Sequence, residues 1–402
     1  MSFAFLQLLP LAIVLFLLQG LAAIPWLAML TRSSPRRDFS FFAKVVGGTA
    51  LAGLPFAFLL ESNSDPSIVA LWGRFYAAIL TLQIGFDFFI LTYYALLNVW
   101  PKGGAVALAA FQESVRQPMF WMLTILGGLV MAVSIVIPYF TFGEDLKMVK
   151  EISYALTMIL PAIFGVISAS ISVSEEIEGR TAVTLLSKPV TRREFLFGKF
   201  LGITLAGLFM TMFLSWILIW VVLAKFAYDF QPGITQIPPD PAWLTDLLET
   251  TYGPTISGDL LRGVGLWFRD TGDALPGLII GFGQVMTLIA ISVALATRVP
   301  MVVNITMCFV VIYPLGHLAP IMTEVSQRLP VGQALVHFFA QLLELLLPGL
   351  AMFDVSSAIV RDVPLDPQRY SLYTFNVVLY ASMYTAIALL AGLILFEDRD
   401  VA

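Results

Sequence analysis

The feature that most constrains this chain of 402 residues is the recurrence of long apolar runs. A run of about 20 apolar residues, coiled as a helix, is long enough to cross the hydrocarbon core of a bilayer. Such runs cover residues 6–30, 41–60, 76–99, 119–141, 153–173, 200–224, 276–297, 300–322 and 373–396. Charged residues make up only 12% of the chain, and the deficit extends along its whole length. The sequence predicts an all-α polytopic membrane protein with about nine transmembrane helices.

The orientation of these helices is predicted from the positions of lysine and arginine. Both residue types concentrate in the cytoplasmic connections of membrane proteins. One set of alternate connections carries dense basic clusters, as in residues 32–44 and 180–199, whereas basic residues in the other set are spread over much longer segments. We therefore expect the dense set to be cytoplasmic. Nine helices then place the N-terminus outside the membrane and the C-terminus inside.

The chain lacks the residue patterns of common enzyme and metal-binding classes. Its one cysteine, Cys308, allows no intramolecular disulfide and no site built from several thiolates. Two histidines, His317 and His337, are too few for a histidine-rich metal site. The dipeptide Gly198-Lys199 lacks the glycine-rich phosphate loop of a Walker A motif. The net charge of −5 disfavours nucleic acid as a partner. We expect a chain with no enzymatic activity of its own, no cofactor and no metal.

The densest charged segment, residues 174–199, joins the fifth and sixth apolar runs on the predicted cytoplasmic side. Glu176 and Glu178 are expected to extend the fifth helix beyond the membrane. Gly179 is a residue at which helices commonly end, so a break is expected there. Arg180 follows directly and adds to the positive charge of this connection.

A second, short helix is predicted to follow that break, over residues 181–186. Thr181 caps it, its apolar side chains require a protein partner outside the lipid, and Pro189 ends it. Thr191 then begins the next helix, with Glu194 at the capping-box position, and this helix continues through Lys199 into the sixth run. The simplest interpretation is a cytoplasmic loop with good helix caps. The alternative is a projecting helical unit that binds another protein.

Residues 105–118 form a third kind of segment, too short and too polar to span the bilayer. Apolar side chains, among them Phe111, line one helical face, while Glu113 and Arg116 lie off it. We expect an amphipathic helix on the cytoplasmic surface that ends at Pro118.

Residues 225–275 contain several prolines and seven acidic residues. This composition predicts an ordered external loop with one or two short helices, at 242–251 and 257–268.

Two further segments carry polar groups in apolar surroundings. Asp87 lies in the middle of the third run, where an isolated carboxylate costs several kcal/mol unless it is paired or protonated. We interpret it as a substrate or partner contact, or else as a neutral acid inside the bundle. Residues 331–352 are apolar but place His337, Gln341 and Glu344 on one helical face, which favours an interfacial or re-entrant helix over a tenth span.

The segment 174–199 resembles the connection between the second and third spans of ABC-2 type permeases, the membrane subunits of ATP-driven exporters. The resemblance lies in the pattern Glu176-x-Glu178-Gly179-x-Thr181, Leu185-Leu186-Ser187-x-Pro189-Val190-Thr191-Arg192-x-Glu194 and Gly198-Lys199. Arg180 is inserted between Gly179 and Thr181. With this insertion, the pattern resembles the branch of the family that includes permeases of nitrous-oxide-reductase maturation and gliding-type systems. Further similarity lies in Leu347–Asp354 and in the end Leu395–Asp400, so the resemblance covers about residues 101–402.

This resemblance implies a role for most of the chain. Residues 101–402 would be a six-span core with external loops at 225–275 and 323–372. The resemblance says nothing about residues 1–100, which a predicted joint at Lys102-Gly103-Gly104 separates as a three-span region. The segment 174–199 would contain a coupling helix that docks into a cytoplasmic ABC ATPase. Its contacts would come from Glu176, Glu178, Gly179, Arg180, Thr181, Leu185, Leu186, Pro189, Arg192, Glu194 and Lys199, beside the amphipathic helix with Phe111, Glu113 and Arg116.

The function implied is that of a permease subunit of an exporter in the bacterial cytoplasmic (inner) membrane. Two permease copies, identical or homologous, would form a dimer around an unknown substrate. One alternative is a scaffold of the same fold that acts mechanically on an envelope protein. A secondary transporter is disfavoured because ion coupling requires buried ionisable groups, and these are scarce in the six-span part.

Overall fold

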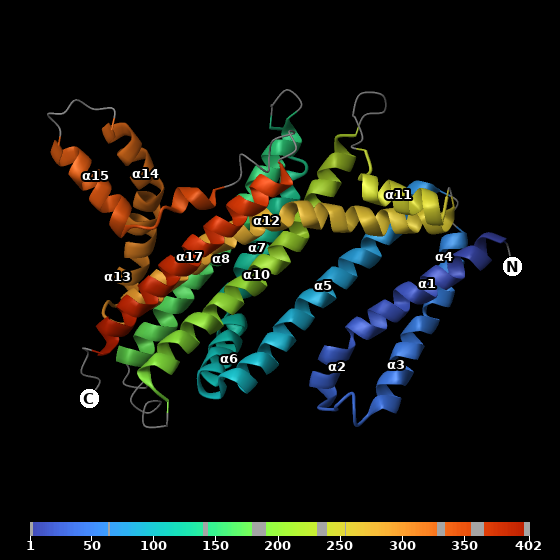
Figure 1. Cartoon of the computed structure of the whole chain (residues 1–402), viewed down its shortest axis with the longest axis horizontal. Helices are drawn as coiled ribbons and strands as arrows, with labels where there is room; N and C mark the ends of the chain where they lie inside the picture. The colour runs from blue at the N-terminus through green and yellow to red at the C-terminus, as the bar shows by residue number, and fades with distance from the viewer. Residues whose placement is uncertain are drawn as a thin grey trace. The chain divides into compact units, whose positions relative to one another are not determined.

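The protein is built from helices throughout the part that the computed structural model describes, namely residues 3–62, 65–139, 144–178, 190–230, 239–253, 255–327, 334–354 and 366–397 (Figure 1). The helices, in chain order, are α1 (Phe3–Ala22), α2 (Ile24–Thr31), α3 (Phe39–Leu51), α4 (Gly53–Glu61), α5 (Pro66–Val99), α6 (Pro101–Arg116), α7 (Pro118–Ser134), α8 (Asp145–Glu178), α10 (Arg192–Tyr228), α11 (Ala242–Thr251), α12 (Ile256–Ala296), α13 (Met301–Thr306), α14 (Tyr313–Gln327), α15 (Ala334–Leu346) and α17 (Pro367–Glu397). A π-helical segment, η1 (Met307–Ile312), joins α13 to α14, and a 3-10 turn, η3 (Leu350–Phe353), follows α15.

The predicted all-α polytopic fold is confirmed. Within the described residues, eight helical segments are long and apolar enough to cross a membrane, and a ninth is obtained if the bent pair α6 and α7 counts as one span. The two helices of that pair meet at 58°, because Gln117 is extended (ψ 132°) before Pro118. Each of the nine predicted apolar runs overlaps one of these segments.

The described helices group into two compact units. Unit 1 comprises residues 1–95 and 231–273, and unit 2 comprises residues 96–230 and 274–402. The sequence-based division near residue 101 assigned 231–273 to the six-span part and stays a prediction. The helix α12 contributes its first half to unit 1 and its second half to unit 2.

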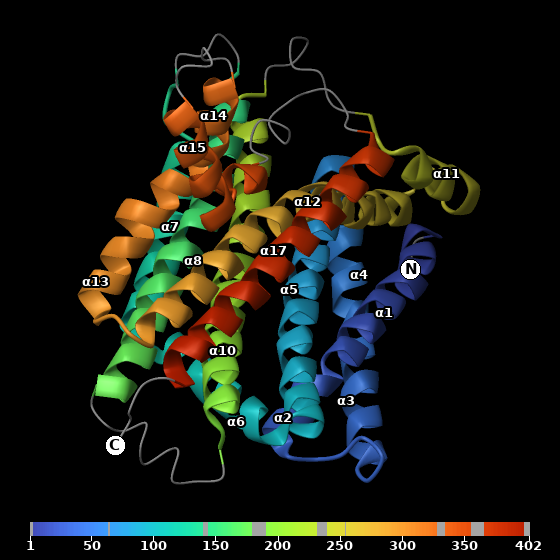
Figure 2. The same cartoon turned by 60° about the vertical axis from the view of Figure 1, so that its left-hand side comes forward.

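Unit 1 contains an apolar core built mainly from α1, α4 and α5, which are labelled in Figure 2. Helices α5 and α12 cross closely, because each contributes a glycine at the crossing. A Cβ atom on Gly263 would lie 1.9 Å from the Ala70 carbonyl oxygen, and one on Gly73 would lie 2.2 Å from that of Leu260. Small residues allow this approach of two backbones in a membrane protein.

Polar contacts flank the same crossing of α5 and α12. The Arg74 guanidinium donates to Asp270 at 2.7 Å, and both side chains are at most one-fifth exposed. The indole N–H of the buried Trp267 donates to the Thr81 hydroxyl at 3.0 Å. These contacts fix the rotation of α12 relative to α5.

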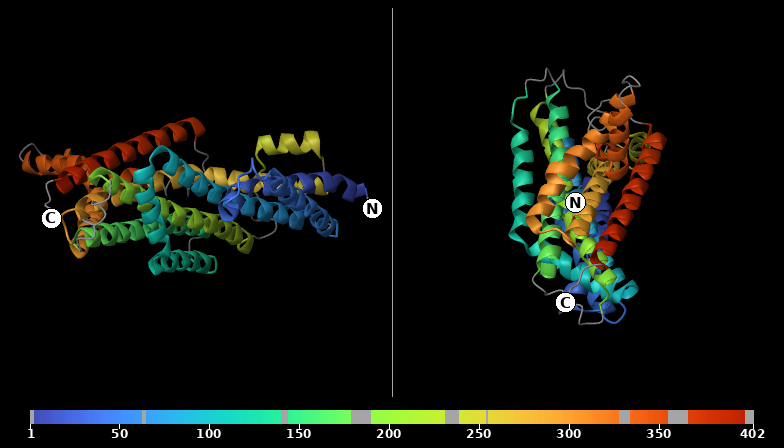
Figure 3. Two further views of the ribbon diagram at one scale, coloured as in Figure 1. Left: turned by 90° about the horizontal axis from the view of Figure 1, so that it is seen from below. Right: turned by 90° about the vertical axis from the view of Figure 1, so that its left-hand side faces the viewer.

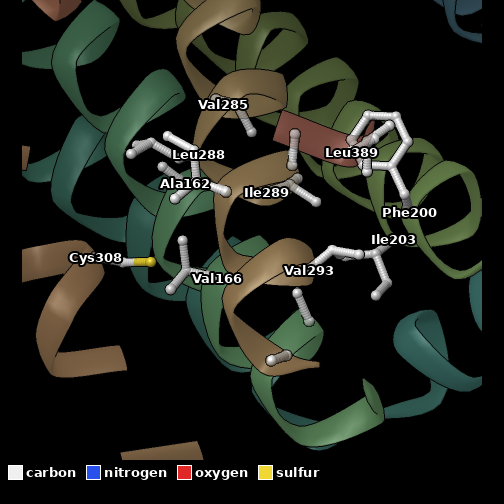
Figure 4. Packing of buried hydrophobic residues seen from close by; sticks show 14 of the residues in the cluster. Ala162, Val166, Phe200, Ile203, Val285, Leu288, Ile289, Val293, Cys308 and Leu389 are labelled. Atoms are coloured by element: carbon white, nitrogen blue, oxygen red, sulfur yellow. The ribbon is translucent and has the colours of Figure 1, made fainter. Parts of the chain in front are cut away.

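Unit 2 contains the larger apolar core, formed by α8, α10, α12 and α17. Figure 4 shows its centre, where Ala162 and Val166 of α8 face Ile289 and Val293 of α12. The neighbouring helices α7 and α8 pack on each other and can be followed in Figure 3. Helices α14 and α15 also pack on each other, as a hairpin at one end of this unit (Figure 1).

The segment predicted as an external loop over 225–275 is more helical than expected. The predicted helix at 242–251 is present as α11. The predicted short helix at 257–268 and the predicted span at 276–297 are instead one continuous helix, α12, of 41 residues. The polar residues between them looked like a connection, but Asp270 pairs with Arg74 of α5 and the helix continues through Pro276.

The glycine at the α5/α12 crossing leads to a stability prediction. Gly263→Ala is expected to lower the melting temperature of the purified protein, because the added methyl group overlaps a backbone carbonyl that cannot move independently, at a cost of about 1–3 kcal/mol. Gly272→Ala is the matched control in the same helix, where a Cβ meets nothing within 4 Å and alanine favours the helix. Equal melting temperatures for the two variants, measured in the same detergent, would contradict the described crossing.

Candidate functional site

The ends of α8 and α10 that flank residues 179–189 meet at a buried lysine. Lys199 lies in the second turn of α10, and its side chain is only 6% exposed. Its ammonium group donates to the Glu176 carboxylate at 2.6 Å, the Ser172 hydroxyl at 2.8 Å and the Glu113 carboxylate at 3.3 Å. Glu176 and Ser172 belong to α8, and Glu113 belongs to α6. One side chain therefore connects three helices.

The contacts of Lys199 account for its burial. An ammonium group has three N–H donors, and here each has an oxygen acceptor. Two carboxyl groups face one cation, so the cluster of Lys199, Glu176 and Glu113 carries a net negative charge when both acids are ionised. Burial raises the pKa of Glu176, and the nearby Lys199 partly offsets that effect. Removal of the cation would take a charged hydrogen bond from the partly buried Glu176 carboxylate, which is unfavourable.

Helix α8 is also bonded to its neighbours through alternate serines, on two opposite faces. Ser168 lies one turn before Ser172, and its hydroxyl contacts that of Ser114 in α6 at 3.1 Å. Residues four apart share a helical face, so this face of α8 points toward α6 and α10.

The other two serines of the series bond α8 to α12 and the turn that follows it. Ser170 contacts the Ser292 hydroxyl at 3.2 Å, and Ser174 donates to the carbonyl oxygens of Ala296 at 3.4 Å and Val299 at 3.3 Å. Asn304 of α13 extends this network by donating to the Ser292 carbonyl at 2.9 Å. The end of α8 that leads into residues 179–189 therefore makes polar contacts on both sides.

The first turn of α10 is fixed by a cap and by an arginine. Thr191 and Glu194 form the predicted capping box, in which the Glu194 side chain accepts from the Thr191 backbone N–H at 2.7 Å. The Arg192 guanidinium donates to the carbonyl oxygens of Phe396 at 2.7 Å and Glu397 at 2.9 Å. A cation at the carbonyl end of a helix is favourable, so Arg192 stabilises the junction of α10 with the end of α17. Arg298, after α12, donates to the neighbouring Leu395 carbonyl at 2.7 Å.

The structure brings together some of the residues predicted for the site. Glu176, Lys199 and Glu113 share one cluster, and Arg192 and Glu194 lie at the start of α10. Phe111 packs edge-on against Phe209 of α10, with ring centroids 5.9 Å apart. Of the other predicted residues, Arg116 is exposed and Asp87 belongs to unit 1, apart from this cluster. Glu178 is the last residue of α8. The remaining predicted residues lie outside the described part of the chain: Gly179, Arg180, Thr181, Leu185, Leu186 and Pro189.

Several polar residues of this region were not identified from the sequence. The serines at 168, 170, 172 and 174, together with Ser292, Asn304 and Arg298, connect the described helix ends. The alternation of serine in 168–174 was the available signal, because four hydroxyls so close together in an apolar run require partners. Within the described ranges, no three histidine, cysteine or acidic side chains gather as metal ligands do.

Comparison with known proteins assigns a family to this arrangement. The profile described as ABC-2 family transporter protein matches residues 105–401. The match begins in α6 and covers α8, α10 and the segment between them. No curated protein matches the chain significantly.

The buried lysine leads to the second prediction. Lys199→Met is expected to reduce stability by about 1.5–3 kcal/mol, because it removes a charged hydrogen bond to the partly buried Glu176 carboxylate, which is 23% exposed. The matched control is Arg193→Gln, which removes an ion pair with Glu397 whose side chains are 72% and 52% exposed and which is worth at most about 1 kcal/mol. Thermal unfolding of the purified variants measures both effects.

A double variant distinguishes lost charge pairing from lost packing. If the cost arises from the lost attraction between Lys199 and Glu176, Lys199→Met combined with Glu176→Gln will recover part of the lost stability. If Lys199→Met is as stable as Arg193→Gln, the Lys199–Glu176 ion pair does not stabilise the junction of α6, α8 and α10.

Proposed function

Because this chain belongs to the ABC-2 transporter family, we propose that it is the permease subunit of an ATP-driven exporter. Its multi-pass membrane character and its family are established above. The further proposal is that residues 179–189 receive the movement of a separate cytoplasmic ATPase and pass it to the membrane helices. The family match does not distinguish a branch, so the nitrous-oxide-reductase maturation and gliding-type resemblance belongs to the proposal as well.

The observation that carries this proposal is the Lys199 cluster. Residues 179–189 leave α8 at Glu178 and are followed by α10, which begins at Arg192. Lys199 holds these two helix ends together and binds α6 at the same point. A force applied to the segment is therefore transmitted to three helices as a group, and bending of one free helix end would not absorb it.

The contacts at the start of α10 extend the same argument. Arg192 lies just after the segment and binds the final carbonyls of α17. Ser174 lies just before it and binds the end of α12. Four long helices of unit 2 thus have polar contacts within two turns of the segment, as a transmission element requires.

The sequence also supports an ATPase in a separate subunit. The chain has no Walker A motif, while the proposed docking segment carries two adjacent leucines, Leu185 and Leu186, between charged residues. Apolar side chains surrounded by charges are typical of an anchor that fills a pocket on a partner, with the charges fixing its orientation. We infer a cytoplasmic ABC ATPase as that partner, and a second permease, identical or homologous, completing the substrate path.

The proposed location is the bacterial inner membrane, with the N-terminus outside and the C-terminus in the cytoplasm. This orientation places the Lys199 cluster and the docking segment on the side where ATP is present.

A scaffold that moves an envelope protein without solute transport is the second candidate. The observation that favours it is the first half of α12, which together with α11 forms an ordered part of unit 1 instead of a simple loop. ATP turnover stimulated by a small solute in reconstituted vesicles would count against the scaffold and for the exporter.

The docking segment leads to the third prediction. Leu185→Asp combined with Leu186→Asp is expected to abolish co-purification of a co-expressed ABC ATPase, because two charges cannot enter an apolar pocket. Leu372→Asp, at the predicted external end of α17 where the leucine is 61% exposed, is the matched control and should leave binding intact. ATPase capture in mild detergent and ATP turnover are the measurements. Wild-type capture and turnover by the double variant would disprove the coupling assignment.

A further inference from the structure

A buried carboxyl group in unit 1 has no role in the proposed coupling. Asp87 lies in α5, is 8% exposed, and its Oδ1 atom has no hydrogen-bond donor among the described residues. An ionised carboxylate in a membrane-spanning helix is costly unless something neutralises it. The surroundings of Asp87 therefore indicate what it binds.

The position of Asp87 relative to α1 follows from two contacts. The Tyr76 hydroxyl donates to the Leu15 carbonyl at 2.5 Å, and the Gln83 and Gln19 side chains bond to each other. The later residue of α1, Gln19, pairs with the later residue of α5, Gln83. The two helices therefore run in the same direction. Residues 76, 83 and 87 share one face of α5, since they are spaced by seven and four. One turn beyond the glutamine pair, the register places Asp87 level with Ala23.

Ala23 is the point at which the first apolar run breaks into α1 and α2 (Figure 1). Pro25, at the start of α2, has no backbone N–H, so the Leu21 carbonyl lacks the helical donor four residues later. The Oε1 atom of Gln19 is buried and also has no donor within the described part of the chain. Carboxylate, amide and backbone oxygens thus occur within about one helical turn of each other along the helix pair, and all three are acceptors.

Among the described residues of α1, α2, α3 and α5, no cationic side chain lies buried at this level. Helices α1 and α2 contain no ionisable side chain, and the one in α3, Lys44, is exposed. Arg74 of α5 lies 13 residues before Asp87, about 20 Å along the helix, and pairs with Asp270. On α5 itself the nearest other titratable side chains are Tyr93 and Tyr94, neither of which carries a cationic group.

We propose that Asp87, Gln19 and the break between α1 and α2 form an intramembrane binding site for a monovalent cation, either a proton or Na⁺. One carboxylate balances one positive charge, and oxygen atoms are the ligands that alkali cations take. A helix break in a membrane protein supplies such oxygens, because carbonyl groups freed from the helix can face an ion. The site lies wholly in unit 1 and does not rest on the proposed coupling to an ATPase.

Dicyclohexylcarbodiimide, which attacks protonated carboxyl groups in apolar surroundings, is the first probe. The full-length purified protein is treated at a series of pH values, with Na⁺ or choline as the only added cation, and labelling of Asp87 is measured by mass spectrometry. Asp65 is the internal control, because it is exposed and its carboxylate accepts from the Ser67 backbone N–H at 2.9 Å and hydroxyl at 2.7 Å. The expected result is labelling of Asp87 at least tenfold above that of Asp65, falling as the pH rises.

The competing cation distinguishes the two ligands. Suppression of labelling by Na⁺ but not by choline at one pH assigns the site to sodium, and suppression by rising pH alone assigns it to the proton. Absence of labelling at every pH, or labelling unaffected by both pH and Na⁺, would overturn the proposal.

Thermal unfolding of Asp87→Asn gives a readout independent of chemical labelling. The amide keeps the shape of the carboxylate, removes its charge and supplies an N–H donor to the neighbouring acceptors, so the variant is expected to fold. The melting temperature of the wild type should depend on Na⁺ concentration or pH, and that dependence should be lost in Asp87→Asn but retained in Asp65→Asn. Identical dependence in all three proteins would reject the site.

Discussion

The arrangement of unit 2 depends on the burial of the Lys199 ammonium group. A buried cation is tolerated only when its charge is balanced and its donors are all accepted. Those acceptors come from α6 and α8, so α10 cannot rotate or slide along either helix without breaking a charged hydrogen bond. Apolar packing alone would allow such sliding more readily, because one lipid-like surface resembles another. The charge therefore determines the mutual register of three helices that apolar contact leaves less defined.

A second buried lysine stabilises the opposite end of the same helix. Lys225 is 2% exposed and lies 3.1 Å from the Asp229 carboxylate, 3.2 Å from the Ile135 carbonyl oxygen and 3.9 Å from the Asp145 carboxylate. The last two partners adjoin α7 and α8. Helix α10 thus has a buried cation near each end and an apolar surface between them. This distribution makes α10 the most firmly positioned helix of the unit and a suitable element for transmitting movement along its axis.

The sequence predicted the helices well and the contacts between them poorly. Apolar runs, the Thr191–Glu194 capping box and the helix at 242–251 are local features, and the structure contains all three. The partners of Lys199 are 23 and 86 residues away, and no periodicity connects such positions. The same holds for Gly202, where a Cβ atom would lie 2.2 Å from the Ala107 carbonyl of α6, so a glycine that looked unremarkable in sequence is required for close packing. The polar stretch around Asp270 was wrongly predicted to be a connection between helices, although it lies inside α12. The partner of Asp270, Arg74, lies nearly 200 residues earlier, so no local pattern indicated this pairing.

The alternate serines of α8 show why the two sides of this helix differ mechanically. On the face toward α6 and α10, the polar contacts include a cation and two carboxylates, whereas on the face toward α12 they are neutral hydroxyls and carbonyls. Neutral hydrogen bonds between membrane helices contribute on average only about 0.6 kcal/mol each, and charged hydrogen bonds are roughly twice as strong as neutral ones. Hydroxyl groups can also exchange one carbonyl acceptor for another, as the contacts of Ser174 with both Ala296 and Val299 illustrate. We therefore expect α6, α8 and α10 to move as one body, with the rearrangement concentrated where α8 meets α12.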